Sequence, residues 1–207
     1  MMRPPPEARL SELFSGVLDT DADGTVSVGE VLDRAGDRGY GFLLVILAIP
    51  AFIPVLPPGT SGVLGLLMSL IALQMLFGRT QPWVPYRWRQ RRLAPNTVDR
   101  LQTQGVALLR KLERFTFPRG RWLVHNGLFL RWNALVVIYM ALILSSPLPF
   151  LNTLPAFGVL LIGVGLINHD GYLLIAGNLI AVVLLFLLGG SFHLLMKSFE
   201  GFLRLFQ

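Results

Sequence analysis

Hydrophobic residues form two long apolar stretches in this chain, each interrupted near its middle by prolines. No Asp, Glu, Lys or Arg occurs between Gly39 and Gly78, and Asp170 is the one such residue between Trp132 and Met196. Charge-free stretches of this length are typical of a lipid bilayer, and proline interrupts helices. The pattern predicts an all-α membrane protein built from two proline-broken helical hairpins.

The breaks predict the lengths of the helical arms. We expect arms at 39–56 and 61–77 in the first stretch, and at 132–146, 154–167 and 172–188 in the second. At ~1.5 Å per residue, each arm of the first stretch is roughly 26 Å long, which is marginal for a hydrocarbon core of about 30 Å. The arm at 154–167 is too short to cross alone. The sequence therefore predicts re-entrant-like hairpins rather than straight spans.

The two stretches follow a similar pattern, which predicts an internal repeat. In each, a proline break is followed by small polar residues and then by an apolar arm; the first arm ends at Arg79 and the second at Asp170. Repeated, proline-interrupted segments are a feature of transporters with a site near the bilayer midplane. The pattern leaves open whether the repeats are parallel or inverted, and the odd number of arms in the second stretch favours inversion.

Polar residues at the breaks and at the ends of the returning arms are the candidate functional residues. If both breaks reach the midplane, the helix N-termini that follow them would face a common point and attract an anionic group, although helix capping explains the same hydroxyls and amides. Asp170 is either a functional intramembrane acid or a turn residue, and Arg79 either pairs with it or reaches lipid phosphate. The candidates are Pro57, Pro58, Thr60, Ser61, Gln74, Arg79, Pro149, Asn152, Thr153 and Asp170.

Charged residues are concentrated outside the apolar stretches. The chain is 53% hydrophobic and 14% charged, against about 25% charged in an ordinary soluble domain. Of its 18 Lys and Arg residues, twelve lie at 79–131, beside all 4 tryptophans. Such a segment is typical of a cytoplasmic loop next to anionic lipid, and this position explains its charge without nucleic-acid binding.

The charge pattern also divides the chain into regions. These are polar N-terminal helices with an acidic turn at 1–38, a first hydrophobic hairpin at 39–79, a basic loop at 80–131, a second broken repeat at 132–192 and an amphipathic tail at 193–207. The basic loop has an apolar stripe of helical spacing from Val98 to Phe115. This amphipathic helix would lie in the membrane interface, pack on the hairpins, or pair with a second subunit in a homodimer.

The N-terminal acidic turn matches a calcium-binding pattern. Its oxygen-bearing residues have the spacing of an EF-hand loop, with Gly24 at the position of the sharp turn. A solvated acidic turn explains the same residues, and Ser27 with Glu30 also reads as the capping box of a helix at 27–37. The candidate ligands are Asp19, Asp21, Asp23, Thr25, Ser27 and Glu30.

Residues that carry catalytic chemistry are sparse. The chain has no cysteine, and His125, His169 and His193 lack the spacing of a metal site. No phosphate-binding glycine loop or nucleophile elbow is present. We therefore predict a protein that is not an enzyme and has no cofactor other than the candidate calcium ion; an intramembrane enzyme that uses Asp170 and His169 is the least favoured of the alternatives.

The order of motifs resembles the ExoD family of bacterial membrane proteins. The resemblance is carried by Arg38-Gly39, the proline ladder to Gly59, Gln74, Gly78-Arg79 and Pro82-Trp83-Val84-Pro85, and in the second half by Pro147-Leu148-Pro149, Asn152-Thr153-Leu154-Pro155 and Asp170-Gly171. One departure is His169, where the family pattern leads us to expect Arg. The resemblance implies a multi-pass protein of the inner membrane that takes part in exopolysaccharide production beside the synthesis and export machinery. A small transporter or channel for an ion or an anionic, lipid-linked substrate is the alternative.

Overall fold

The computed structural model describes residues 10–20, 24–51, 59–113, 120–146 and 152–204, and this part of the chain is helical, without strands. The prediction of an all-α protein is confirmed. The helices are α1 (Leu10–Val17), α2 (Val28–Ala35), η1 (Gly36–Arg38), α3 (Gly39–Ala51), α4 (Thr60–Leu76), α5 (Tyr86–Arg89), α6 (Pro95–Arg100), η2 (Leu101–Gly105), α7 (Val106–Glu113), α8 (Arg121–His125), α9 (Gly127–Ser145), α10 (Thr153–Asn168) and α11 (Gly171–Arg204).

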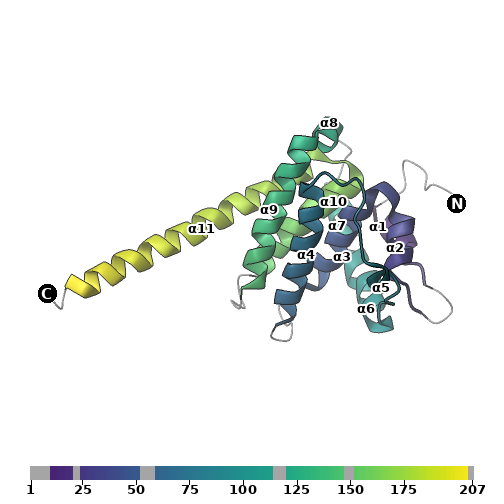
Figure 1. Cartoon of the computed structure of the whole chain (residues 1–207), viewed down its shortest axis with the longest axis horizontal. Coiled ribbons are helices and arrows are strands. Elements are labelled where there is room, and N and C mark those ends of the chain that lie inside the picture. Colours follow the sequence, from purple (N-terminus) through teal and green to yellow (C-terminus); the bar gives the residue numbers. More distant parts are fainter. Residues whose placement is uncertain (1–9, 21–23, 52–58, 114–119, 147–151, 205–207) are drawn as a thin grey trace.

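Four apolar helices, α3, α4, α9 and α10, form a bundle (Figure 1). Helix α3 packs against α4 and α10, and α9 packs against the same two helices. Glycines permit close approach of the backbones: a Cβ atom at Gly65 of α4 would lie 2.5 Å from the Ala141 carbonyl oxygen of α9, and one at Gly41 of α3 would lie 2.7 Å from the Gly163 carbonyl oxygen of α10. Small residues at helix contacts are the usual means of tight packing between apolar helices in membranes.

The two hairpins of the bundle point in the same direction. Gly62, near the start of α4, lies beside Ser145 at the end of α9, while Gly41, near the start of α3, lies beside Ile167 near the end of α10. The helices that flank the two proline breaks therefore end and begin at the same end of the bundle, whereas inverted hairpins would place the two breaks at opposite ends. The odd arm does not reverse the second hairpin, because α11 turns back at Asp170 and packs on the outside of α10.

Helix α10 is the centre of the fold, and α11 extends away from it. From Pro155 to Ile167 nearly every side chain of α10 is buried, since α3, α9 and α11 surround it. Helix α11 continues as one helix through the predicted boundary at 192 and leaves the bundle obliquely (Figure 1). In the described part, α9 and the segment Gly171–Gly190 of α11 are long and apolar enough to cross a membrane, and α4 and α10 are shorter apolar helices. Re-entrant insertion and an internal repeat stay predictions.

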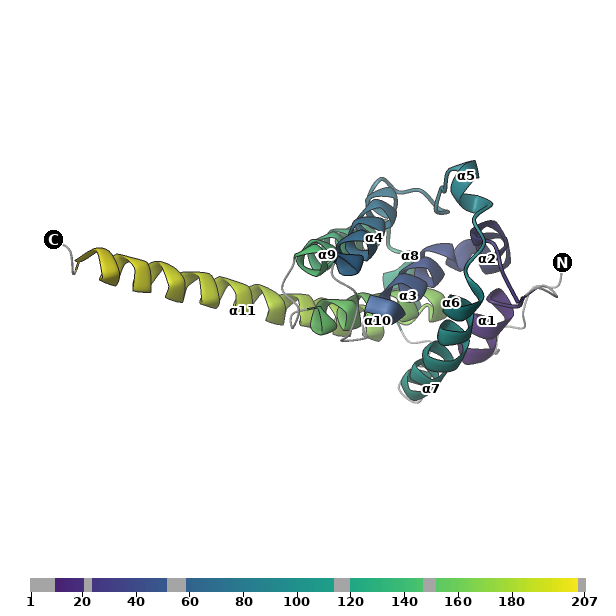
Figure 2. The ribbon, with the colours of Figure 1, turned by 90° about the horizontal axis from the view of Figure 1, so that it is seen from below.

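The shorter helices α1, α2 and α5–α7 form a layer on one side of the bundle, away from the free end of α11 (Figure 2). One close contact with the bundle is at Gly105 of η2, where a Cβ atom would lie 2.8 Å from Ile49 Cδ1 of α3 and 3.3 Å from Phe14 Cε1 of α1. The apolar stripe of the basic loop thus packs on the protein's own first hairpin, which is one of the three arrangements that the sequence left open. The π-helical turn η2 shifts the helical register, so that Leu109 rather than Leu108 becomes fully buried.

Candidate anion-binding pocket

A pocket of about 480 Å³ lies at the end of the bundle opposite the proline breaks. At this end α3 and α9 begin and α4 and α10 finish, so all four bundle helices contribute to its wall. Its lining residues are Asp37, Arg38, Tyr40, Gly41, Met75, Gly78, Arg79, Thr80, Val124, Gly127, Leu130, Arg131, Leu166 and His169.

Two similar helix endings position the pocket residues. Helix α4 ends in a Schellman motif, in which Gly78 has φ 74° and Arg79 N–H donates to the Gln74 carbonyl oxygen at 3.3 Å. Helix α10 ends in the same way, with His169 at φ 52° and Asp170 N–H donating to the Gly165 carbonyl oxygen at 2.9 Å. Arg79 and Asp170 therefore occupy equivalent positions after their helices, as the two stretches of sequence predict.

The segment after α4 is held across the pocket by two hydrogen bonds. Gln74 Oε1 accepts from Trp83 N–H at 2.6 Å, and Tyr40 Oη donates to the Gln81 carbonyl oxygen at 3.2 Å. Gln74, a predicted functional residue, thus has a positioning role in the structure. Together these bonds fix the wall that carries Arg79 and Thr80.

The electrostatics of the pocket favour an anion. Three arginines, Arg38, Arg79 and Arg131, line the pocket, against one acidic residue, Asp37. In the described part of the chain no ion pair within 4 Å involves any of these three arginines. Burial lowers the pKa of Arg38, but arginine remains charged in proteins. Guanidinium groups bind carboxylates and phosphates through paired, charge-assisted hydrogen bonds.

Asp170 does not form the predicted pair with Arg79. Its side chain is buried, at 2% exposure, and Oδ1 accepts from Tyr172 N–H at 3.0 Å, so it caps the first turn of α11. Arg79 is exposed and lines the pocket, and no ion pair joins it to Asp170 in the described residues. Asp170 is therefore a helix cap, and a functional role for this buried carboxylate stays a prediction.

The remaining candidates at the breaks lie far from the pocket. Thr60 and Ser61 begin α4, and Asn152 and Thr153 begin α10, all at the opposite end of the bundle. Asn152 makes no side-chain capping hydrogen bond, and its buried Oδ1 has no partner among the described residues. The candidates Pro57, Pro58 and Pro149 lie outside the described residues.

Two of the candidate calcium ligands, Ser27 and Glu30, cap helix α2 in the structure. Ser27 N–H donates to Glu30 Oε2 at 2.8 Å and Glu30 N–H donates to Ser27 Oγ at 3.2 Å, which confirms the capping box. The backbone hydrogen bond from Ser27 lowers the pKa of Glu30, with smaller contributions from Arg34 and Arg92. Thr25 Oγ1 accepts from Arg92 at 3.0 Å. Of the EF-hand features, Gly24 has the expected positive φ of 67°.

The candidate ligands of this turn are only partly visible. Asp19 contributes its backbone carbonyl oxygen to Arg34 at 2.5 Å, and Asp21 and Asp23 lie outside the described residues. Calcium binding by this turn stays a prediction.

Of the polar pocket residues, only Arg79 was a site candidate from sequence; the six that sequence analysis missed are Asp37, Arg38, Tyr40, Thr80, Arg131 and His169. A signal for two of them exists, since Arg38 directly precedes the first charge-free stretch and Arg131 directly precedes the second. Charges at the matching edges of two hairpins that point the same way come together at one end of a bundle. His169 lies in the pocket at the position where the family pattern leads us to expect Arg.

Comparison with known proteins agrees with the arrangement of motifs. A family model described as "Exopolysaccharide synthesis, ExoD" matches residues 10–190. The chain belongs to the ExoD family. It is 34% identical to Protein ExoD of Rhizobium meliloti over 172 residues, which cover 82% of this chain and 71% of that protein. It is also 32% identical to an uncharacterized protein of Synechocystis sp. over 178 residues, or 86% of this chain and 84% of that protein. No solved structure matches the chain significantly.

Proposed function

We propose that this ExoD-family protein takes part in exopolysaccharide production by binding an anionic group at the membrane, in the pocket lined by Arg38, Arg79 and Arg131. The supporting observation is the concentration of three guanidinium groups at the end of an apolar bundle. The hydroxyl group of Thr80 adds a neutral hydrogen-bond donor, while the Tyr40 hydroxyl holds the pocket wall through its bond to the Gln81 carbonyl oxygen. This chemistry suits the phosphate or sugar acid of a lipid-linked saccharide, whose lipid part would lie along the apolar bundle.

The protein acts in this proposal by binding and placing its ligand, without a reaction of its own. The inner membrane of a bacterium, with the basic segment on the cytoplasmic side, is the location that the charge distribution favours. Neighbouring proteins of polysaccharide synthesis or export would receive the bound group. The transporter alternative makes a different demand, because it requires flux of the anion across sealed liposomes.

Direct binding tests the proposal. Purified protein in detergent is titrated with a polyprenyl phosphate and, separately, with the uncharged polyprenol of the same length. We expect Arg38→Gln, Arg79→Gln and Arg131→Gln each to weaken phosphate binding roughly 10- to 100-fold, the value of one charge-assisted hydrogen bond. Arg87→Gln, at an exposed arginine outside the pocket, is the matched control and should bind as the wild type does.

Two results would refute this function. One is equal affinity for the phosphate and the uncharged polyprenol, which would show that the guanidinium groups contribute nothing. The other is an equal loss of binding in Arg87→Gln, which would show a general charge effect. In cells, the same pocket variants should reduce exopolysaccharide output while leaving the amount of the protein unchanged.

A further inference from the structure

One side of the molecule presents apolar side chains to its surroundings along the full length of the bundle. On α4 these side chains follow each other at helical spacing from Val63 at the start to Phe77 at the end, and they are 40% to 74% exposed. Because α9 packs against both α4 and α11, the exposed faces of the three helices join into one surface, here called the apolar flank. Its members are Val63, Leu66, Leu70, Leu73, Phe77, Leu128, Trp132, Leu135, Leu142, Tyr172, Ile175, Leu179, Val182, Val183, Leu185, Phe186 and Leu187.

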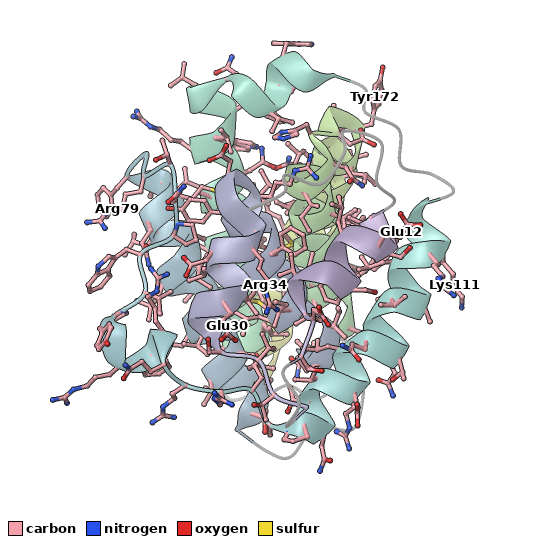
Figure 3. The ribbon with its side chains drawn as sticks, turned by 90° about the vertical axis from the view of Figure 1, so that its right-hand side faces the viewer. Glu12, Glu30, Arg34, Arg79, Lys111 and Tyr172 are labelled. Carbon is pink, nitrogen blue, oxygen red and sulfur yellow. The ribbon has the colours of Figure 1, made fainter. Side chains whose placement is uncertain are left out.

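The other side of the bundle carries charge at the same levels. The layer of α1, α2 and α5–α7 covers α3, and its contact at Gly105 reaches Ile49, about 15 Å along α3 from its first residue. Figure 3 faces this charged flank, over which Glu12, Glu30, Arg34 and Lys111 are spread. Its exposed charged residues include Glu12, Asp33, Arg34, Arg87, Arg91, Arg92, Asp99, Arg100, Arg110 and Lys111.

These two surfaces cannot share one surrounding medium. Charged side chains are rarely tolerated against hydrocarbon, and a continuous apolar surface of this extent marks a contact with a membrane or a partner. We propose that lipid acyl chains contact the apolar flank alone, while the charged flank faces water. A bundle enclosed by lipid on every side would instead bring into hydrocarbon the helical segment that contacts Ile49 at Gly105, with Arg100 and Arg110 each about 7.5 Å along it from that glycine.

The rim of the apolar flank identifies lipid as its occupant. Trp132, at 56% exposure, and Trp122, at 70% exposure, lie at the pocket end of the flank, together with Arg79 and Arg131. Tryptophan and arginine side by side are the residues that occupy the headgroup region of anionic membranes. A second copy of the chain would require no such rim.

Single-cysteine variants can test the two flanks, because the chain contains no natural cysteine. Leu70→Cys and Leu142→Cys report on the apolar flank, and Gln104→Cys and Ala107→Cys report on exposed sites of the charged flank near the level of Ile49. Each variant carries a nitroxide label and is reconstituted in vesicles of phosphatidylethanolamine and phosphatidylglycerol. Collision with oxygen, which partitions into lipid, is compared with collision with a water-soluble nickel complex present on both sides of the membrane.

We expect labels at 70 and 142 to collide with oxygen and labels at 104 and 107 to collide with nickel, with ratios that differ at least tenfold between the flanks. Oxygen-dominated collisions at all four positions would overturn the proposal, since lipid would then surround the bundle. Nickel-dominated collisions at 70 and 142 would also overturn it, because water would cover the apolar flank. Protection from both reagents there would indicate a second copy instead of lipid. A thermal unfolding curve for each variant confirms that it is folded.

Discussion

The contact between α4 and α9 gives a direct test of the bundle geometry through Gly65→Ala. A methyl group at Gly65 would meet Ser145 Oγ and would lie 2.5 Å from the Ala141 carbonyl oxygen. The serine hydroxyl can rotate away, but the carbonyl oxygen belongs to the backbone of α9, so the two helices have to separate. Overpacking of this kind costs about 1–3 kcal/mol.

Gly62→Ala, one turn earlier on α4, is the matched control. Its methyl group would find the Ser145 carbonyl oxygen at 3.8 Å as its nearest neighbour, which is ordinary contact. Both variants gain the higher helix propensity of alanine, up to about 1 kcal/mol, so this gain largely cancels when the two are compared. The free energy of unfolding of Gly65→Ala should then be about 1–3 kcal/mol below that of Gly62→Ala.

Thermal unfolding in dodecyl maltoside, followed by tryptophan fluorescence, measures this difference. For a chain of this size ~1 kcal/mol corresponds to roughly 2–4 °C in Tm, so Gly65→Ala should melt roughly 2–12 °C below Gly62→Ala. Circular dichroism before heating shows whether both variants keep their helices. If Gly65→Ala is as stable as Gly62→Ala, then α4 and α9 do not cross closely at Gly65 and this part of the bundle geometry is wrong.

Three other sites give further predictions. Asp170→Ala should lower the free energy of unfolding by about 1 kcal/mol, while Asp170→Asn should be nearly neutral, since an amide also caps a helix. A large loss of anion binding by Asp170→Asn would instead indicate that the charge of Asp170 is functional. Folding lowers the pKa of Glu30 from its ordinary value of 4.5, so the charged carboxylate stabilises the protein above pH 4.5. This stabilisation is lost as the pH falls through the lowered pKa of the folded state. The Tm of Glu30→Gln should therefore fall less steeply between about pH 5 and 2 than that of the wild type. Calcium should raise the Tm of the wild type but not of Glu30→Gln if the acidic turn is an EF-hand, and an equal response of both would exclude Glu30 as a ligand. Asn178 Nδ2 donates to Asn133 Oδ1 at 3.0 Å between α11 and α9, and a double-mutant cycle with leucine should give a coupling of about 1 kcal/mol; additive losses would show that the pair does not join the helices.

The helical arms could be located from sequence because their signals are local. The predicted arms at 61–77 and 154–167 differ by one residue at each end from α4 and α10, since the absence of charge and the position of prolines delimit them directly. The capping box was readable for the same reason, because Ser27 and Glu30 are three residues apart and satisfy each other's backbone N–H groups. The predicted arm at 132–146 begins five residues late, because Asn126, which caps α9, precedes Arg131 and the charge pattern set the boundary there.

By itself the sequence determined the all-α class, the family, and the separation into apolar and charged segments, because composition and spacing along the chain contain all of this information. Tertiary structure alone decided that the hairpins point the same way and that the stripe of the basic loop is buried against Ile49. It also brought Arg38, Arg79 and Arg131 to one pocket, and it separated Asp170 from Arg79. The physical reason is that close glycine contacts, such as that of Gly41 with Gly163, determine which helix faces pack together. Such a contact joins residues more than a hundred positions apart in the chain, so local sequence patterns do not reveal it.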